Sequence, residues 1–151
     1  MSDKMDFLSA LTIAVSAVGG VIASLLGGAD TLLDTLLLFM VIDIFLGVYM
    51  SAWKHKSPKT DAGKFSSQTF WEGITRKFLT FIIIIIAVYL DGLLGTYFVV
   101  GDMNATLLRS AVILFYIFNE ASSILETMAI LGMRLPKKLL NMLEVLKENN
   151  D

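Results

Sequence analysis

Residues 78–100 have the sequence FLTFIIIIIAVYLDGLLGTYFVV, in which Asp91 is the one charged side chain. Five consecutive isoleucines would favour a β-strand in water, because β-branched side chains fit a pleated surface. A lone strand in a bilayer leaves its backbone groups without partners, whereas a helix satisfies its own. At about 1.5 Å per residue, the run is long enough to cross the roughly 30 Å hydrocarbon core of a bilayer. The stretch therefore predicts a transmembrane helix.

The composition of the whole chain points the same way. Of 151 residues, 56% are hydrophobic and only 17% are charged, and the mean hydropathy is +0.72. Soluble proteins have about 25% charged residues. A soluble domain of this length cannot enclose so many apolar side chains, because small domains leave much of their surface in water. We therefore expect an all-α integral membrane protein that forms a single domain over residues 1–151.

Three further stretches are long and apolar enough to cross a membrane. The four predicted spans are residues 7–27, 32–53, 78–100 and 107–131. The first could be taken for a secretory signal, but its apolar run is longer than usual and acidic residues precede it. We therefore retain it as a span. The even spacing of short alternating strands that is typical of a membrane β-barrel does not occur.

The distribution of basic residues predicts the orientation. The loop 54–77 holds six lysines and arginines and the tail after residue 133 holds four, whereas the connections near 28–34 and 101–106 hold none. Short loops rich in Lys and Arg remain in the cytoplasm. With four crossings, all the basic segments fall on one side. We therefore expect both termini and the loop 54–77 to be cytoplasmic.

The tail at residues 136–149 predicts a C-terminal amphipathic cytoplasmic helix. Its apolar residues recur at helical spacing: Leu139, Met142, Leu143 and Leu146. Such a helix either lies on the membrane surface or pairs with a partner, and the pattern favours the surface-lying helix.

Several chemical functions are excluded by the residues themselves. The chain has no Cys, one His and a net charge of −2. It therefore offers no thiolate metal site, no cysteine nucleophile and no basic surface of the kind that binds nucleic acid. Phosphate-binding loops and hydrolase motifs are also missing. We expect no enzyme activity, no catalytic residues, no cofactor and no metal.

Acidic residues inside the apolar spans require an explanation. Asp43, Glu120 and Glu126 lie well inside their spans, and Asp91 lies inside the third span or near its outer end. Each would cost about 2.5–3.5 kcal/mol at the bilayer centre, so these side chains must face protein or water. Asp43 and Glu120 fall at similar depths in their spans. Asp91 is predicted to pair with Arg109, since both lie near the outer side.

The fourth span has a polar face. Along one helical stripe lie Arg109, Tyr116, Glu120, Ser123 and Thr127, and on its flank lie Asn119, Ser122 and Glu126. Such a face either lines the interior of a helical bundle or turns from protein to water when copies assemble. The residues alone support both interpretations.

Small residues form a second pattern. Ser16, Gly20, Ser24 and Gly28 recur every four residues in and after the first span, and Gly47 lies one turn beyond Asp43. Small residues at this spacing allow helices to approach closely in lipid. The spacing does not reveal whether they pack within one chain or between copies.

Several motifs, in their order along the chain, resemble a known family. They are GGADTLL at 27–33, DIFLG at 43–47, GITRK at 73–77, FYIFNE at 115–120, SILE at 123–126 and LGMRLP at 131–136. The chain resembles the toxin-secretion/phage-lysis holin family over nearly its whole length. One departure is Ile44, where members often have an aromatic residue, and it bears on local packing.

The resemblance implies a non-enzymatic lysis protein. Such proteins accumulate in the bacterial cytoplasmic membrane, form homo-oligomers and open lesions that release an endolysin or a large toxin, which also collapses the proton-motive force. Two other functions remain open from the residues alone. The chain could be a small proton- or ion-coupled transporter or channel subunit that uses the intramembrane carboxylates, or a passive membrane anchor.

Overall fold

A computed structural model describes residues 2–54, 67–97, 106–136, 138, 139 and 141. Throughout these residues the fold is helical, without strands. The helices are α1 (Ser2–Leu25), α2 (Thr31–Tyr49), α3 (Ser67–Tyr97) and α4 (Leu107–Ile130), and a π-helical turn, η1 (Met50–Lys54), extends α2. Each of the four long helices has the length and composition needed to cross a membrane. The expected all-α membrane architecture is therefore present.

Helix α3 begins earlier than the sequence predicted. We placed the start of the third span at residue 78, after a basic loop at 54–77, but the helix begins at Ser67. Its 31 residues extend over about 46 Å, more than a bilayer core requires. Hydropathy marks where a helix leaves the hydrocarbon, whereas backbone hydrogen bonds continue into the headgroup region. The end of the basic loop is therefore part of a helix.

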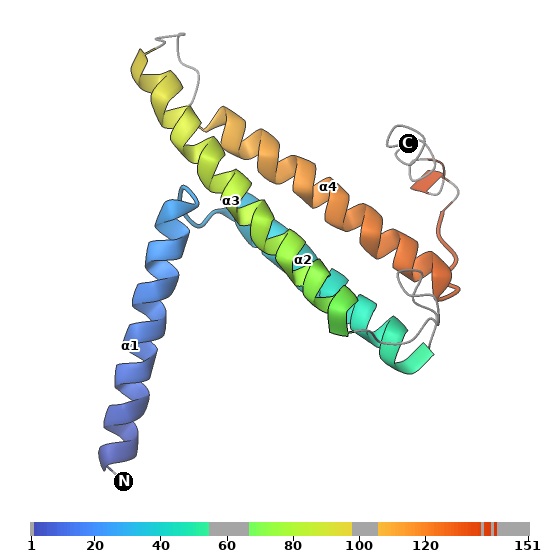
Figure 1. Cartoon of the computed structure of the whole chain (residues 1–151), viewed down its shortest axis with the longest axis horizontal. Helices are drawn as coiled ribbons and strands as arrows, with labels where there is room; N and C mark the ends of the chain where they lie inside the picture. The colour runs from blue at the N-terminus through green and yellow to red at the C-terminus, as the bar shows by residue number, and fades with distance from the viewer. Residues whose placement is uncertain (1, 55–66, 98–105, 137, 140, 142–151) are drawn as a thin grey trace.

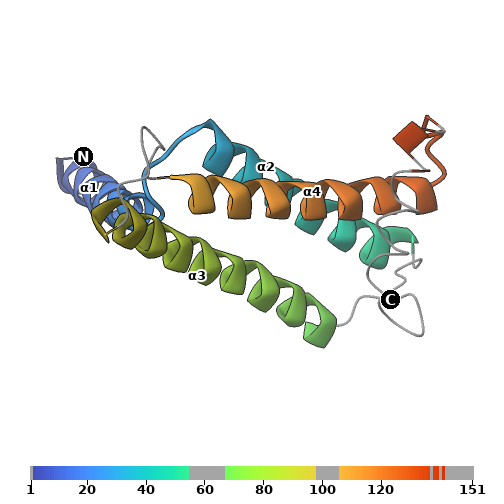
Figure 2. The same cartoon turned by 90° about the horizontal axis from the view of Figure 1, so that it is seen from above.

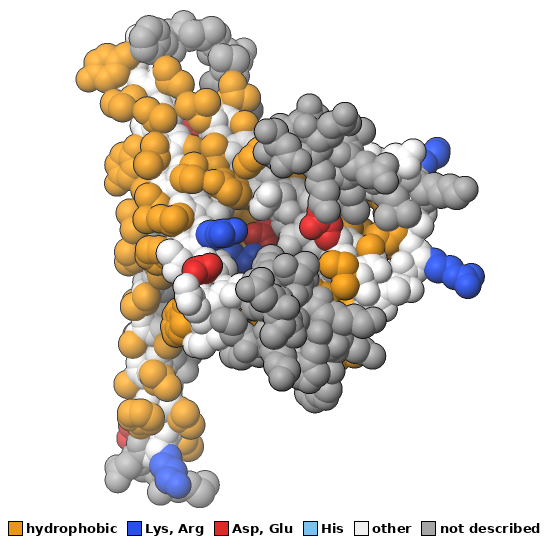
Figure 3. All heavy atoms as spheres, turned by 45° about the vertical axis from the view of Figure 1, so that its right-hand side comes forward, with side chains coloured by type: hydrophobic (Ala, Val, Ile, Leu, Met, Phe, Trp, Pro, Cys, Tyr) orange, Lys and Arg blue, Asp and Glu red, His pale blue; other side chains and the backbone are white. Residues whose placement is uncertain are grey.

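Helices α2, α3 and α4 form a bundle in which α4 packs against both of the others (Figures 1 and 2). Leu36 of α2, Ile84 of α3 and Ile113 of α4 are fully buried at its centre. The outward sides are apolar: Phe45, Phe78 and Phe115 are all at least 65% exposed. Hydrophobic side chains gather along the long left-hand side of the view in Figure 3. A surface of this kind suits contact with lipid.

Helix α1 diverges from this bundle (Figure 1). Its side chains are exposed from Lys4 to Ile22. Ser16, Gly20 and Ser24 of the small-residue pattern are exposed too, and Gly28 lies beyond the helix in the following turn. Among the described residues, no helix packs on these small residues of α1. Their role in helix packing therefore stays a prediction, which other copies of the chain would have to fulfil.

Glycines end two of the helices. At the end of α1, the Gly28 N–H donates to the Ala23 carbonyl and the Gly27 N–H to the Ser24 carbonyl, with Gly27 at φ 81°. This is the Schellman pattern, which requires a left-handed residue that glycine adopts without strain. Helix α4 ends in the same way around Gly132, at φ 89°.

The predicted amphipathic helix at 136–149 lies mostly outside the described residues. Within them, the Leu139 N–H donates to the Pro136 carbonyl over 2.9 Å. The tail helix and its cytoplasmic position stay predictions.

Candidate functional site

A lysine between two carboxylates joins all three helices of the bundle. The Nζ atom of Lys77 on α3 lies 3.0 Å from Oδ2 of Asp43 on α2, and it also donates to Oε2 of Glu120 on α4. The three side chains are nearly buried, with 7–14% of their surface exposed. We call Asp43, Lys77 and Glu120 the lysine triad.

The triad explains how two intramembrane acids are tolerated. Asp43 and Glu120, which the sequence places at similar depth, contact the same ammonium group. A buried carboxylate without a partner is strongly unfavourable, and an opposite charge in contact offsets much of that cost. The two acids still outnumber the single base, so the triad retains a net negative charge when all three groups are ionised.

Sequence reasoning missed Lys77 because it was counted as a loop residue. The structure places it in the eleventh position of α3, whose first residue is Ser67. A lysine has a long apolar stem that lets its ammonium group reach several ångströms from its backbone. A usable signal was present: two acids at equal depth require a cation, and Lys77 adjoins the third predicted span.

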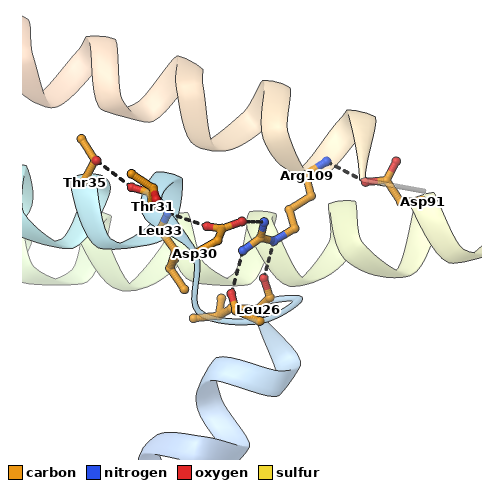
Figure 4. Close-up of polar contacts among 8 residues, drawn as sticks. Leu26, Asp30, Thr31, Leu33, Thr35, Asp91 and Arg109 are labelled. Carbon is orange, nitrogen blue, oxygen red and sulfur yellow. Dashed lines mark hydrogen bonds and ion pairs between the residues drawn. The ribbon is translucent and has the colours of Figure 1, made fainter. Parts of the chain in front are cut away.

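A second polar cluster lies where α4 begins. Arg109 is 3% exposed, and its guanidinium donates to the Leu26 carbonyl over 2.6 Å and to the Gly28 carbonyl over 2.8 Å. It also pairs with the carboxylate of Asp30 over 2.5 Å (Figure 4). All three partners belong to the turn between α1 and α2. We call Arg109, Leu26, Gly28 and Asp30 the arginine clamp.

Asp91 contacts the backbone of Arg109, whereas the sequence predicted an ion pair with its guanidinium. Its carboxylate accepts the backbone N–H groups of Leu108 over 2.9 Å and of Arg109 over 2.8 Å. The first N–H groups of a helix lack partners within the helix, and a carboxylate there also interacts favourably with the helix dipole. Asp91 of α3 therefore caps α4, and the guanidinium pairs instead with Asp30.

Asp30 has two structural roles. It is the N-cap of α2, where its Oδ1 accepts the Leu33 N–H over 2.9 Å. Its other oxygen pairs with Arg109. The hydrogen bond from Arg109 lowers the pKa of Asp30, with a smaller lowering from the backbone N–H of Leu33. Sequence reasoning missed this role, although an Asp directly before an apolar helix is an N-cap pattern.

The polar face of α4 divides between interior and surface. Arg109, Glu120 and Thr127 are buried. The intermediate positions are Tyr116, Ser122, Ser123 and Glu126. Asn119 is exposed. Much of the polar stripe therefore lines the bundle interior, as the first of the two interpretations requires.

Gly47 also lies on the bundle, in α2. It is half-buried, and a Cβ atom added to it would meet no other group within 4 Å. Within the described residues, no three or more His, Cys, Asp or Glu side chains gather where they could hold a metal ion.

A comparison with known protein families shows to which family this chain belongs. A family model described as the bacteriophage holin family matches residues 20–148. This chain belongs to the bacteriophage holin family. Membership points to a holin-like, non-enzymatic protein of the cytoplasmic membrane, which agrees with the four apolar helices.

Individual relatives cover most of the length of this chain. A probable holin of Bacillus phage phi105 is 35% identical over 79% of this chain and 76% of its own. An uncharacterized protein of Listeria innocua is 35% identical over 88% of this chain and 84% of its own. An uncharacterized protein of Clostridium perfringens is 32% identical over 93% of each. No solved structure matches this chain.

Proposed function

We propose that this protein accumulates in the bacterial cytoplasmic membrane, assembles into homo-oligomers and opens lesions. An endolysin or a large toxin leaves the cytoplasm through the lesion, and the proton-motive force collapses. The lipid bilayer is its direct partner, and the released protein need not touch it. The lysine triad is the observation that supports this proposal most strongly.

The triad provides a reason why opening the bundle would admit water. Asp43, Lys77 and Glu120 come from three different helices, so separating α2, α3 and α4 breaks their contacts. Charged groups separated in hydrocarbon have no compensating partner, which is costly. The same groups separated in water are hydrated. Rearrangement of the bundle is therefore favourable only where water enters, which couples assembly to an aqueous opening.

The proposal includes an orientation with both termini and the loop 54–77 in the cytoplasm. The arginine clamp supports part of it, because it holds the turn after α1 against the start of α4. These two places must then lie on the same side of the membrane. They flank the two connections that contain no basic residue, which the positive-inside rule assigns to the outside.

The test is to induce the protein in bacteria that also express a cytoplasmic endolysin without its own export signal. Culture lysis is timed for the parent, for Asp43→Asn and for Glu120→Gln at equal membrane levels. We expect both amide variants to insert normally but to lyse at shifted times, because each changes the charge of the triad. Asp34→Asn, which removes an exposed acid outside the triad, is the matched control and should keep the parental timing.

Three outcomes of this experiment are informative. Unchanged timing in both amide variants would exclude the triad mechanism. Selective flux of ions without release of the endolysin would favour a transporter or channel subunit. No change in permeability at all would favour a passive anchor.

A further inference from the structure

The carboxamide of Asn119, on the membrane-facing surface of α4, has unmet hydrogen-bonding capacity. Some hydroxyl groups in the spans bond to the carbonyl four residues back in their own helix, as Thr12, Thr35 and Ser122 do over 2.6–2.9 Å. Gln68, at the start of α3, bonds to Glu72 over 3.1 Å. The carboxamide of Asn119 is exposed and bonds to none of the described residues. It offers two donors and an acceptor oxygen.

The position of Asn119 makes this capacity significant. It is the thirteenth of 24 residues in α4, about 18 Å from the start of the helix and so near the middle of the bilayer core. Its neighbours Phe115 and Phe118 are 66% and 62% exposed and suit hydrocarbon. A carboxamide at that depth gains no hydrogen bond from the lipid acyl chains, which have no hydrogen-bonding groups. The surface around Asn119 therefore requires a polar partner.

The described part of the chain does not provide that partner. The next residue, Glu120, points into the bundle and is held by Lys77. Asn119, one residue before it, lies about 100° round the helix to the side of that contact and is exposed. Helix α1 diverges from the bundle (Figure 1).

We infer that a second copy of this chain docks on α4 at Asn119, with the carboxamides of the two copies hydrogen-bonded to each other. All copies insert in the same direction, so equal residues of two copies lie at equal depth. A symmetric contact between two α4 helices then brings Asn119 next to Asn119, and a carboxamide both donates to and accepts from its like. Buried asparagine pairs fix the register of soluble helix dimers in this way. Phe115 and Ser122, on the same side of α4, would flank the pair.

This inference rests on the proposed function, since it names the surface by which the copies assemble. It also gives the polar flank of α4 a role different from that of the lysine triad. The triad holds the three helices of one copy together, and Asn119 joins two copies.

The absence of cysteine from the chain allows a direct test in membranes. Ser122→Cys is introduced in the full-length protein, and disulfide-linked dimers are measured after mild oxidation. We expect dimers with Ser122→Cys and few with Ile83→Cys, on an exposed position of α3. Adding Asn119→Leu to the Ser122→Cys variant should lower the dimer fraction about fivefold. One interhelical hydrogen bond contributes about 1 kcal/mol, which corresponds to about a fivefold change in the association constant. Asn119→Gln should retain dimers, and Phe118→Leu is the matched control for a neighbouring exposed residue.

Three results would overturn the inference. The first is equal cross-linking with and without Asn119→Leu at equal membrane levels. The second is stronger cross-linking through Gly20→Cys of α1 than through Ser122→Cys. The third is that Asn119→Cys reacts readily with a charged, membrane-impermeant thiol reagent and Ser122→Cys forms no dimers, because Asn119 would then line a water-filled opening.

Lysis assays distinguish failure of this inference from failure of the proposed function. Parental lysis without Ser122→Cys dimers contradicts the α4 interface and leaves the lytic function standing. Dimers that depend on Asn119 in a protein that never permits lysis support the interface and contradict the lytic function.

Discussion

The guanidinium of Arg109 and the carboxylate of Asp30 lie 2.5 Å apart although 79 residues separate them in the sequence. This contact fixes the turn from which α1 leaves the bundle, because the same guanidinium also binds the carbonyls of Leu26 and Gly28. A residue at the start of α4 therefore holds the turn that follows α1. Disturbing the turn should affect how α1 is held without disturbing the lysine triad.

Gly27→Ala should destabilise the protein. Gly27 has φ 81°, and an added Cβ would lie 2.7 Å from Nε of Arg109. A left-handed conformation costs an alanine about 1–2 kcal/mol, and displacing the buried guanidinium adds to that cost. Gly19→Ala is the matched control, since Gly19 lies inside α1 with nothing within 4 Å. Unfolding in mixed detergent micelles measures both variants, and equal stabilities would contradict the structure of the clamp.

The clamp should also weaken in acid. The hydrogen bond from Arg109 lowers the pKa of Asp30 from its ordinary value of 3.8. A lowered pKa means that the pair contributes its full stability above about pH 4 and loses it as the pH falls through the folded pKa. The difference in unfolding stability between the parent and Asp30→Asn should therefore stay constant above about pH 4 and shrink as the pH falls below it.

Asp34→Asn is the control for this acid titration. Asp34 is an exposed acid in the first turn of the same helix and is outside the clamp. A difference between the parent and Asp30→Asn that stays constant with pH would show that the carboxylate does not stabilise the fold through its charge.

Lys77→Met should be strongly destabilising. It would leave Asp43 and Glu120 buried close together without their cation, and breaking a buried ion pair in this way costs about 3–5 kcal/mol. Arg76→Met removes the exposed neighbouring base and should change stability little. The triple variant Lys77→Met, Asp43→Asn, Glu120→Gln should recover part of the loss. Membrane accumulation and unfolding in detergent are the measurements, and an Arg76→Met defect as large as that of Lys77→Met would contradict the triad.

The helices themselves could be predicted from the sequence because each depends on local properties. Apolar runs of sufficient length define the four spans, and the turns at Gly27 and Gly132 follow from the conformational freedom of glycine. The start of α3 could not be predicted in this way. The lysines and arginines before residue 78 indicate where hydrocarbon ends, and a helix has no physical reason to end there.

The two polar clusters were only partly predictable, because they depend on which helices meet. The acids of the triad were identified from their cost in lipid, but Lys77 lies on a helix whose packing the sequence does not reveal. Asp91 and Arg109 were placed near each other correctly. Spacing alone did not show that Asp91 would bind the backbone of α4 and that Asp30 would take the guanidinium. Side-chain partners of this kind follow from tertiary contacts.

The orientation can be tested with single cysteines, since the parent chain has none and gives no background labelling. Ala29→Cys lies at an exposed position in the turn after α1, and Thr60→Cys lies in the predicted basic loop, outside the described residues. If the loop is cytoplasmic, a membrane-impermeant maleimide added to intact cells should label Ala29→Cys, and Thr60→Cys should react only after the cells are permeabilised. The arginine clamp requires α4 to begin on the side that Ala29 faces, so Leu107→Cys should react as Ala29→Cys does. Labelling of Thr60→Cys from outside alone would reverse the proposed orientation.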